Sequence, residues 1–168
     1  MASVQLAAPS TQWPQAFDAL SDAVAPLFAG TGARLEHIGS TAVPGLVAKP
    51  VLDVLLGVPA LEVAEARGEA LQALGFRYRP EYEDVLPGRR YFTRAPGPGL
   101  RVHLHGVVVG SPLWRDHLAF LDALRGDDAL RDAYAALKQA LALRFADDKA
   151  AYTDAKAPFI AQVLATRR

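Results

Sequence analysis

The segment from residue 36 to residue 53 contains an unusual density of side chains that can bind a ligand. Gly39 lets the backbone approach a ligand closely, and Ser40 and Thr41 offer hydroxyls and amides beside it. A helix that starts here would direct its first N–H groups at an anion, and Lys49 adds a positive charge. The segment therefore predicts a small-molecule partner that carries phosphate, such as a nucleotide.

Asp53 lies in residues 51–58, an otherwise apolar run that is typical of a buried β-strand. An ionised carboxylate there costs free energy unless a cation or a hydrogen-bond donor balances it. Asp53 is therefore the candidate catalytic residue. The alternative is a structural role as the partner of a buried Lys49 or of an arginine.

His103 and His105 are two residues apart on a predicted strand, so both imidazoles lie on the same face. Together with Asp53 they form a set of two histidines and one carboxylate, which suits a first-row transition metal better than Mg²⁺. The alternative is that both histidines satisfy polar neighbours or line the face of a sheet.

Two further groups of cations are candidates. Arg90 is assigned to phosphate or carboxylate binding because a guanidinium matches those anions, whereas Arg89 is predicted to lie in a solvated turn. Lys138 follows Tyr134 by four residues, and this spacing is typical of a solvated helix face. Lys156, which follows a tyrosine in the same way, is left open between the surface and the site.

Hydrophobic periodicity predicts the elements that position these residues. An apolar stripe with spacings of three and four predicts a helix, and alternation predicts a strand. Ser111 is a predicted N-cap, and Asp127 or Asp128 is predicted to cap the next helix. The pattern indicates a single α+β domain over residues 1–168, with a mixed β-sheet, helices packed on it and a helical C-terminal third. Strands are predicted over residues 3–8, 34–40, 51–58, 76–82, 90–94 and 100–109, and helices over 13–28, 61–74, 112–126, 128–145 and around 152–163.

Composition excludes several classes of function. Eighteen basic and eighteen acidic residues balance, so a nucleic-acid partner is not expected. The chain has no cysteine, which removes disulfides, thiol nucleophiles and thiolate metal sites. There is no signal-peptide pattern and no apolar run near the ~20 residues that cross a bilayer. A cytoplasmic protein without a membrane partner is the expectation.

The residues Glu36 to Asp53 resemble the hallmark of the GrpB family, E-H-I-G-S-T-x-V-P-G-L-x-x-K-P-x-x-D. The likeness continues at residues 13–17, 103–105, 134–138 and 152–156, so it covers nearly the whole chain. The family is similar to the nucleotidyltransferase superfamily, which implies a sheet of that type. It also implies that a Gly-Ser pair binds nucleotide phosphates and that acids on the next strand hold a divalent metal such as Mg²⁺.

One position departs from the superfamily pattern. A second acid is expected two residues after Asp53, and Leu55 stands there. Glu36 is the nearest substitute metal ligand, because residues 36, 38 and 40 share one strand face while His37 points the other way. The resemblance thus implies a nucleotidyltransferase-like protein with metal-dependent transfer at Asp53. The alternatives are a ligand-binding module without catalysis and a metal-dependent hydrolase that uses Asp53 with the two histidines.

Overall fold

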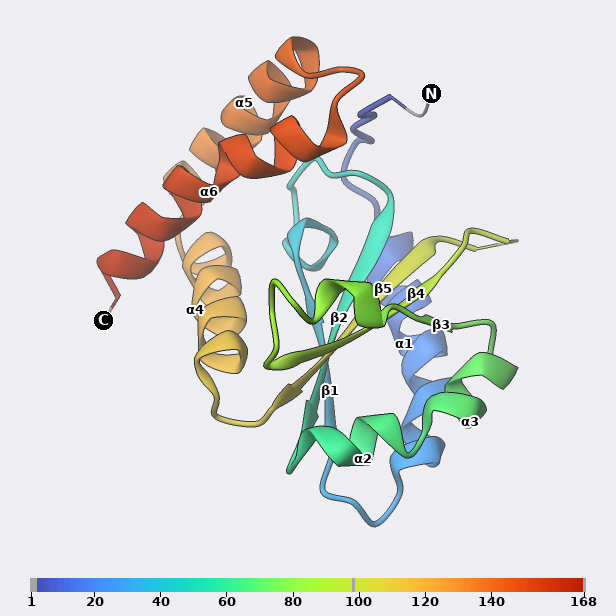
Figure 1. Cartoon of the computed structure of the whole chain (residues 1–168). Helices are drawn as coiled ribbons and strands as arrows, with labels where there is room; N and C mark the ends of the chain where they lie inside the picture. Colours follow the sequence, from blue (N-terminus) through green and yellow to red (C-terminus); the bar gives the residue numbers. More distant parts are fainter. Residues whose placement is uncertain (1–2, 98, 168) are drawn as a thin grey trace.

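The computed structural model describes residues 3–97 and 99–167 and has the predicted α+β architecture, with a helical C-terminal third (Figure 1). The strands are β1 (Arg34–Ile38), β2 (Val51–Val58), β3 (Arg77–Tyr78), β4 (Arg89–Arg94) and β5 (Arg101–Val108); the helices are α1 (Gln12–Val24), α2 (Leu61–Glu65), α3 (Gly68–Ala73), α4 (Pro112–Gly126), α5 (Asp128–Arg144) and α6 (Lys149–Ala165); and the short 3₁₀ turns are η1 (Ala25–Phe28), η2 (Ser40–Ala42) and η3 (Pro80–Tyr82).

The five strands form one mixed sheet in the order β1, β2, β5, β4, β3. β2 and β5 are parallel, and the other neighbouring pairs are antiparallel. Ile38 is paired with Asp53, and Asp53 is paired with His103. The sheet thus brings the three segments that carry candidate residues side by side, as the sequence predicted.

The face of the sheet toward α1, α2 and α3 is apolar. Alternate residues of β2, such as Val54 and Leu56, are buried there with Leu104 of β5. Leu20 of α1 and Leu71 of α3 close this layer from the other side. The hydrophobic burial on this face contributes to the stability of the fold.

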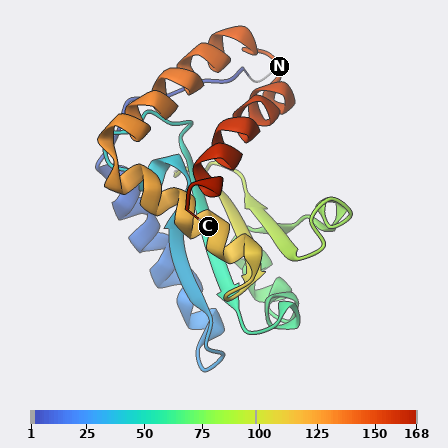
Figure 2. The same ribbon diagram turned by 90° about the vertical axis from the view of Figure 1, so that its left-hand side faces the viewer.

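The opposite face is covered by α4, against which α5 and α6 pack (Figure 2). Each of these helices begins at a side chain that accepts a backbone N–H bond three residues later: Ser111 from Trp114 at 3.3 Å, Asp127 from Leu130 at 3.0 Å, and Asp148 from Ala151 at 3.0 Å. The predicted caps Ser111 and Asp127 are confirmed. Leu55 is fully buried under α4 in the apolar part of this face.

Several predicted elements differ from the structure. The predicted strand 34–40 ends at Ile38, so Ser40 belongs to η2, and the predicted helix 13–28 is α1 followed by η1. Residues 3–8 form only an isolated bridge between Ala7 and Ala48, because the neighbouring backbone is a loop and offers no strand to pair with. The predicted helix 61–74 is interrupted between α2 and α3, and the predicted strand 76–82 is reduced to β3 and η3. Within the described ranges, no helix combines the length and the apolar character needed to cross a bilayer.

Candidate functional site

The carboxylate of Asp53 is held by both candidate histidines. Its Oδ1 is 3.2 Å from His105 Nε2 and 3.5 Å from His103 Nδ1. Burial alone would raise the pKa of Asp53, but hydrogen bonding and electrostatic attraction from the two imidazoles outweigh it and hold the pKa well below its usual range. Asp53 is therefore ionised at neutral pH, and its direct partners are histidines and not Lys49 or an arginine.

The tautomer of His105 follows from its neighbours. Arg89 Nη1 is 3.4 Å from His105 Nδ1, and a guanidinium only donates. Nδ1 therefore accepts, which assigns the ring proton to Nε2 and directs it at Asp53. Arg89, His105 and Asp53 thus form one hydrogen-bonded chain across β4, β5 and β2.

Gly39 is required by its conformation and by its contact with Asp53. It has a φ of +74°, and a Cβ there would lie 2.8 Å from Asp53 Oδ2. Glycine therefore lets the backbone approach the carboxylate of Asp53. The helix expected after Gly39 is the single 3₁₀ turn η2, so the predicted helix N-terminus is not present. Ser40 instead accepts a hydrogen bond from Lys138 Nζ at 2.8 Å.

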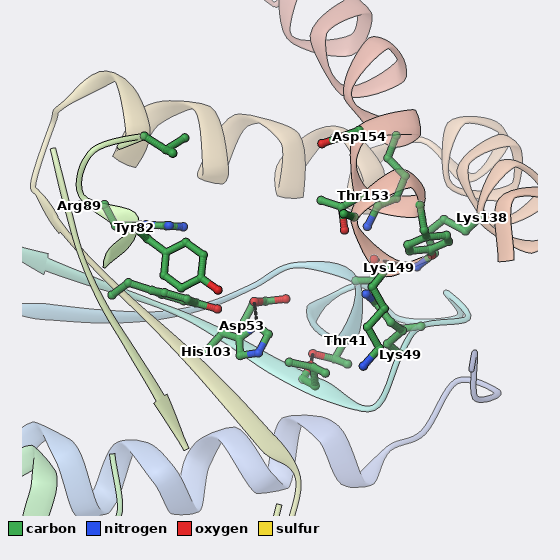
Figure 3. Close-up of a pocket in the computed structure, with 18 residues that line it drawn as sticks. Thr41, Lys49, Asp53, Tyr82, Arg89, His103, Lys138, Lys149, Thr153 and Asp154 are labelled. Carbon is green, nitrogen blue, oxygen red and sulfur yellow. Dashed lines mark hydrogen bonds and ion pairs between the residues drawn. The ribbon is translucent and has the colours of Figure 1, made fainter. Parts of the chain in front are cut away.

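All four lysines of the chain line one cleft of about 780 Å³ beside the sheet (Figure 3). Among the residues that the structure describes, 18 line the cleft. Among the arginines that the structure describes, Arg89 is the one that lines the cleft. Asp53 and Asp154 are its acidic lining residues. The lysines come from the loop before β2, from α5 and from α6; they are Lys49, Lys138, Lys149 and Lys156.

Three of these lysines, Lys49, Lys138 and Lys156, have a lowered pKa because their environment disfavours the charge. Burial, with repulsion from Lys156 and Lys49, lowers the pKa of Lys138 to about 7. Burial and repulsion from Lys49 lower the pKa of Lys156 to about 8. The Nζ atoms of Lys49 and Lys156 also lie 4.9 and 4.6 Å from the centroid of the Tyr152 ring. A bound anion would relieve this repulsion, since it would supply the missing negative charge.

The prediction of a solvated face for Tyr134 and Lys138 is wrong. Their exposed fractions are 4% and 2%. The Tyr134 ring packs against Phe120 of α4 and Phe159 of α6, with centroid distances of 5.3 and 5.1 Å. The apolar stripe of α5, which includes Tyr134 and Leu137, was the sequence signal for this burial.

The predictions for Arg89 and Arg90 are also corrected. Arg90 Nε lies 2.6 Å from Glu65 Oε1 of α2, on the opposite face of the sheet, and Arg90 does not line the cleft. Arg89 belongs to β4 and does line the cleft. Neighbouring strand residues point to opposite faces, so one of the two had to point away. Lys149 and Tyr91 are lining residues that the sequence reasoning missed.

Thr41 stabilises the loop between β1 and β2, and Glu36 lies outside the cleft. The Thr41 hydroxyl donates to Val51 O at 3.0 Å and accepts from His37 Nε2 at 2.9 Å, which closes the loop. His37 points away from the cleft, as predicted, and stacks on Phe17. Glu36 is exposed and lines neither the large cleft nor the adjacent cavity of about 250 Å³ that also includes Asp53.

The donor set does not form a ready metal site. Leu55 is fully buried where the second acid would stand. Both imidazoles are directed at the same carboxylate oxygen. In residues 3–97 and 99–167 no group of three or more His, Asp or Glu side chains is arranged to hold a metal ion. Asp53 is thus a single carboxylate, to which other ligands would have to be added.

Comparison with solved structures identifies the fold class of the chain. The chain superposes on the Cid1 poly(U) polymerase with a TM-score of 0.56 at 15% identity, over 83% of this chain and 43% of that one. It superposes on a conserved protein GrpB from Enterococcus faecalis with a TM-score of 0.86 at 29% identity, over 96% of both chains. The fold is therefore nucleotidyltransferase-like.

Sequence comparison then gives the family. The profile described as GrpB protein matches residues 3–166, so the chain belongs to the GrpB family. It is 33% identical to "UPF0157 protein YqkA" of Bacillus subtilis over 89% of its length and 36% identical to a UPF0157 protein of Pseudomonas aeruginosa over 90%. The chain spans 43% and 62% of the lengths of these relatives. It is also 28% identical to a protein named dephospho-CoA kinase from Mycolicibacterium paratuberculosis, over 94% of this chain and 44% of that protein.

Proposed function

We propose that the cleft binds a phosphate-rich small molecule, with a nucleotide as the leading class, and that Asp53 serves nucleotidyl or phosphoryl transfer from it. The observation that carries the proposal is the convergence of all four lysines on a cleft lined by 18 residues. Lysine ammonium groups bind phosphates as point charges. Four of them exceed the charge of Asp53 and Asp154, which leaves room for a polyanion.

The lysines and Ser40 then have distinct roles. Ser40 and Lys138, which already share a hydrogen bond, would hold one phosphate, while Lys49, Lys149 and Lys156 would offset the remaining charge. Phosphoryl transfer needs little covalent participation from the protein, because positioning and electrostatic stabilisation supply most of the catalysis. The four lysines that line the cleft would supply this electrostatic stabilisation.

A divalent metal fits the proposal when the ligand brings part of its coordination. Mg²⁺ in proteins is commonly bound via one or two carboxylates plus substrate phosphates. Asp53 would be that carboxylate, and the metal would neutralise charge on the phosphates when bound. His103 and His105 would favour a first-row metal instead, which is the donor choice of the hydrolase alternative. Measuring the metal content of the purified protein separates these two assignments.

Binding is tested by calorimetry and thermal unfolding with inorganic tripolyphosphate, nucleoside triphosphates and dephospho-CoA, with and without Mg²⁺. Specific binding must raise the melting temperature by mass action. Lys156→Gln should weaken binding, whereas Arg144→Gln, an exposed cation on α5, should leave it unchanged. The absence of any binding across this panel would refute the proposal.

Transfer is tested separately by mass spectrometry of the nucleotide after incubation with the protein. Release of pyrophosphate or formation of a nucleotidylated product would support catalysis at Asp53, provided that Asp53→Asn abolishes it. Tight binding without turnover would refute transfer and support a ligand-binding module, the alternative favoured by the buried Leu55 in place of the second acid.

A further inference from the structure

Arg89 is a cation for which the fold supplies no counter-charge. None of the ion pairs in the described part of the chain includes it. Its Nε is buried and has no hydrogen-bond acceptor among the described residues. Within residues 3–97 and 99–167, the polar contact that its side chain makes is the 3.4 Å approach of Nη1 to His105. Arg89 is half-buried, and a partly desolvated charge without a counter-charge costs stability that a bound anion would offset.

The surroundings of Arg89 orient its guanidinium toward the cleft. Its Cζ lies 4.4 Å from the centroid of the Tyr91 ring, which stacks the guanidinium along one side of the cleft. Tyr91 is fixed in turn by Tyr82, at 5.4 Å in a T-shaped arrangement, and by His105 at 5.1 Å. A guanidinium held in this way is preorganised for a planar oxyanion.

The same end of the cleft is apolar and aromatic. Tyr82 and Val85, which line it, have exposed fractions of 40% and 78%, so both present carbon surface to a ligand. Figure 3 shows Arg89 and Tyr82 on one side of Asp53, while Lys49, Lys138 and Lys149 lie on the other. The cleft therefore has two chemically different halves, with Asp53 and His103 between them.

We propose that the half of the cleft formed by Tyr82, Val85, Arg89 and Tyr91 is a second binding site, which takes a small aromatic molecule bearing an oxyanion, either a carboxylate or a phosphate. The oxyanion pairs with the Arg89 guanidinium, and the ring packs on Tyr82 and Val85. Binding at this site is independent of the lysine half. The role of the bound aromatic molecule as the acceptor in transfer rests on the function proposed above, because Asp53 lies between the two halves of the cleft.

The test uses three probes on the full chain: benzoate, phenyl phosphate and inorganic tripolyphosphate. Each is titrated calorimetrically into the wild-type protein, Arg89→Gln and Arg90→Gln. The two variants are matched, since they remove the same charge from adjacent residues on opposite faces of β4. We expect Arg89→Gln to weaken an aromatic oxyanion about tenfold or more, as for a hydrogen bond to a charged group, and to leave tripolyphosphate affinity unchanged. Arg90→Gln should change neither affinity.

The melting temperature of every variant is measured to detect a loss of folding. Arg89→Lys is a further variant, which keeps the charge at this position. The lysine variant lacks the planar guanidinium with its paired N–H donors, so it should bind benzoate more weakly than the wild type does. A stronger effect on benzoate than on phenyl phosphate identifies a carboxylate ligand, and the reverse identifies a phosphate. The proposal is overturned if neither aromatic probe binds, if both arginine variants behave alike, or if Arg89→Gln weakens tripolyphosphate equally. Binding of aromatic probes without tripolyphosphate binding would refute the lysine-cleft function and retain this site.

Discussion

On the face of the sheet that packs against α1, α2 and α3, β2 contributes Leu52, Val54 and Leu56, all buried among apolar neighbours. On the opposite face the same strand contributes Asp53 and then Leu55. β4 divides in the same way, because Tyr91 faces the cleft and Phe92 enters the apolar core. The strand period of two lets one set of residues stabilise the sheet while the alternate set carries the charged groups.

The two faces also differ in how their groups are satisfied. Apolar packing needs no particular partner chemistry, so the first face is complete within this chain. The cleft face holds an excess of cations whose charge is disfavoured by burial and mutual repulsion. The first face is thus apolar throughout β2, whereas the opposite face combines an apolar core beneath α4 with the charged cleft, where ligand binding is expected.

The largest expected effect is on the apolar face. Leu56→Ala should lower the free energy of unfolding by about 2–5 kcal/mol, because it removes a fully buried side chain and leaves a cavity. Urea unfolding measures this change. Leu143→Ala, at a position that is 85% exposed, is the control and should have little effect. An equal loss of unfolding free energy in both variants would contradict the expected difference between a buried and an exposed leucine.

On the cleft face, Lys138→Met should separate stability from binding. Methionine keeps the length of the side chain and removes a cation that is 2% exposed, so the unfolding free energy should stay equal or rise. Affinity for tripolyphosphate should fall about tenfold or more, as expected for a lost charged hydrogen bond. Arg144→Met on the same helix serves as the control. A large loss of stability with unchanged affinity would make Lys138 a structural residue.

The affinity of the cleft for tripolyphosphate should depend on pH near neutrality. Lys138 and Lys156 have pKa values of about 7 and about 8, so both are mainly protonated at pH 6 and mainly neutral at pH 9. Affinity should therefore fall as the pH rises through this range. Calorimetry between pH 6 and pH 9 measures it, and Lys138→Met should remove the step near pH 7. A flat profile in the wild type would contradict the assigned lysine environment.

Asp53→Asn is expected to change stability far less than Leu56→Ala. The lowered pKa of Asp53 means that the ionised form stabilises the fold above the carboxyl pKa of the unfolded chain, and that this contribution is lost as the pH falls toward the folded pKa. The variant should be less stable by about 1 kcal/mol at pH 7, because the hydrogen bond with His105 loses its charged acceptor and the attraction to His103 weakens. Urea unfolding should show that the difference shrinks below about pH 4.

Ligand binding decides what the loss of Asp53 means. With Asp53→Asn, the response of nucleotide binding to Mg²⁺ should disappear, whereas the affinity for tripolyphosphate without metal should remain. If the free energy of unfolding falls by several kcal/mol while the response to Mg²⁺ stays normal, Asp53 serves folding, and its assignment to the site is wrong.

Several features of the site were predictable because they depend on local pattern. The apolar run of β2 predicted a buried strand around Asp53, and the spacing of His103 and His105 placed both imidazoles on one face. The caps Ser111 and Asp127 also follow from local hydrogen-bonding chemistry. In each case the information lies within a few residues of the chain.

The arginines and the lysines show where local pattern stops. Alternation says that Arg89 and Arg90 point to opposite faces, but which of them reaches the cleft depends on the pairing of Tyr91 with His105 on β5. The four lysines are separated by up to 107 positions, from Lys49 to Lys156, and nothing in their spacing indicates that they share a cleft.

By itself, then, the sequence determined the α+β class, the order of the main strands and helices, and the carboxylate that the site is built around, since periodicity and composition act over short distances. The tertiary structure alone decided that two imidazoles hold Asp53 and that Lys138 reaches Ser40. It also decided that Arg89 faces the cleft. These contacts depend on strand register and on how α5 and α6 fold back beside the sheet, and both are set by packing between segments far apart in the chain.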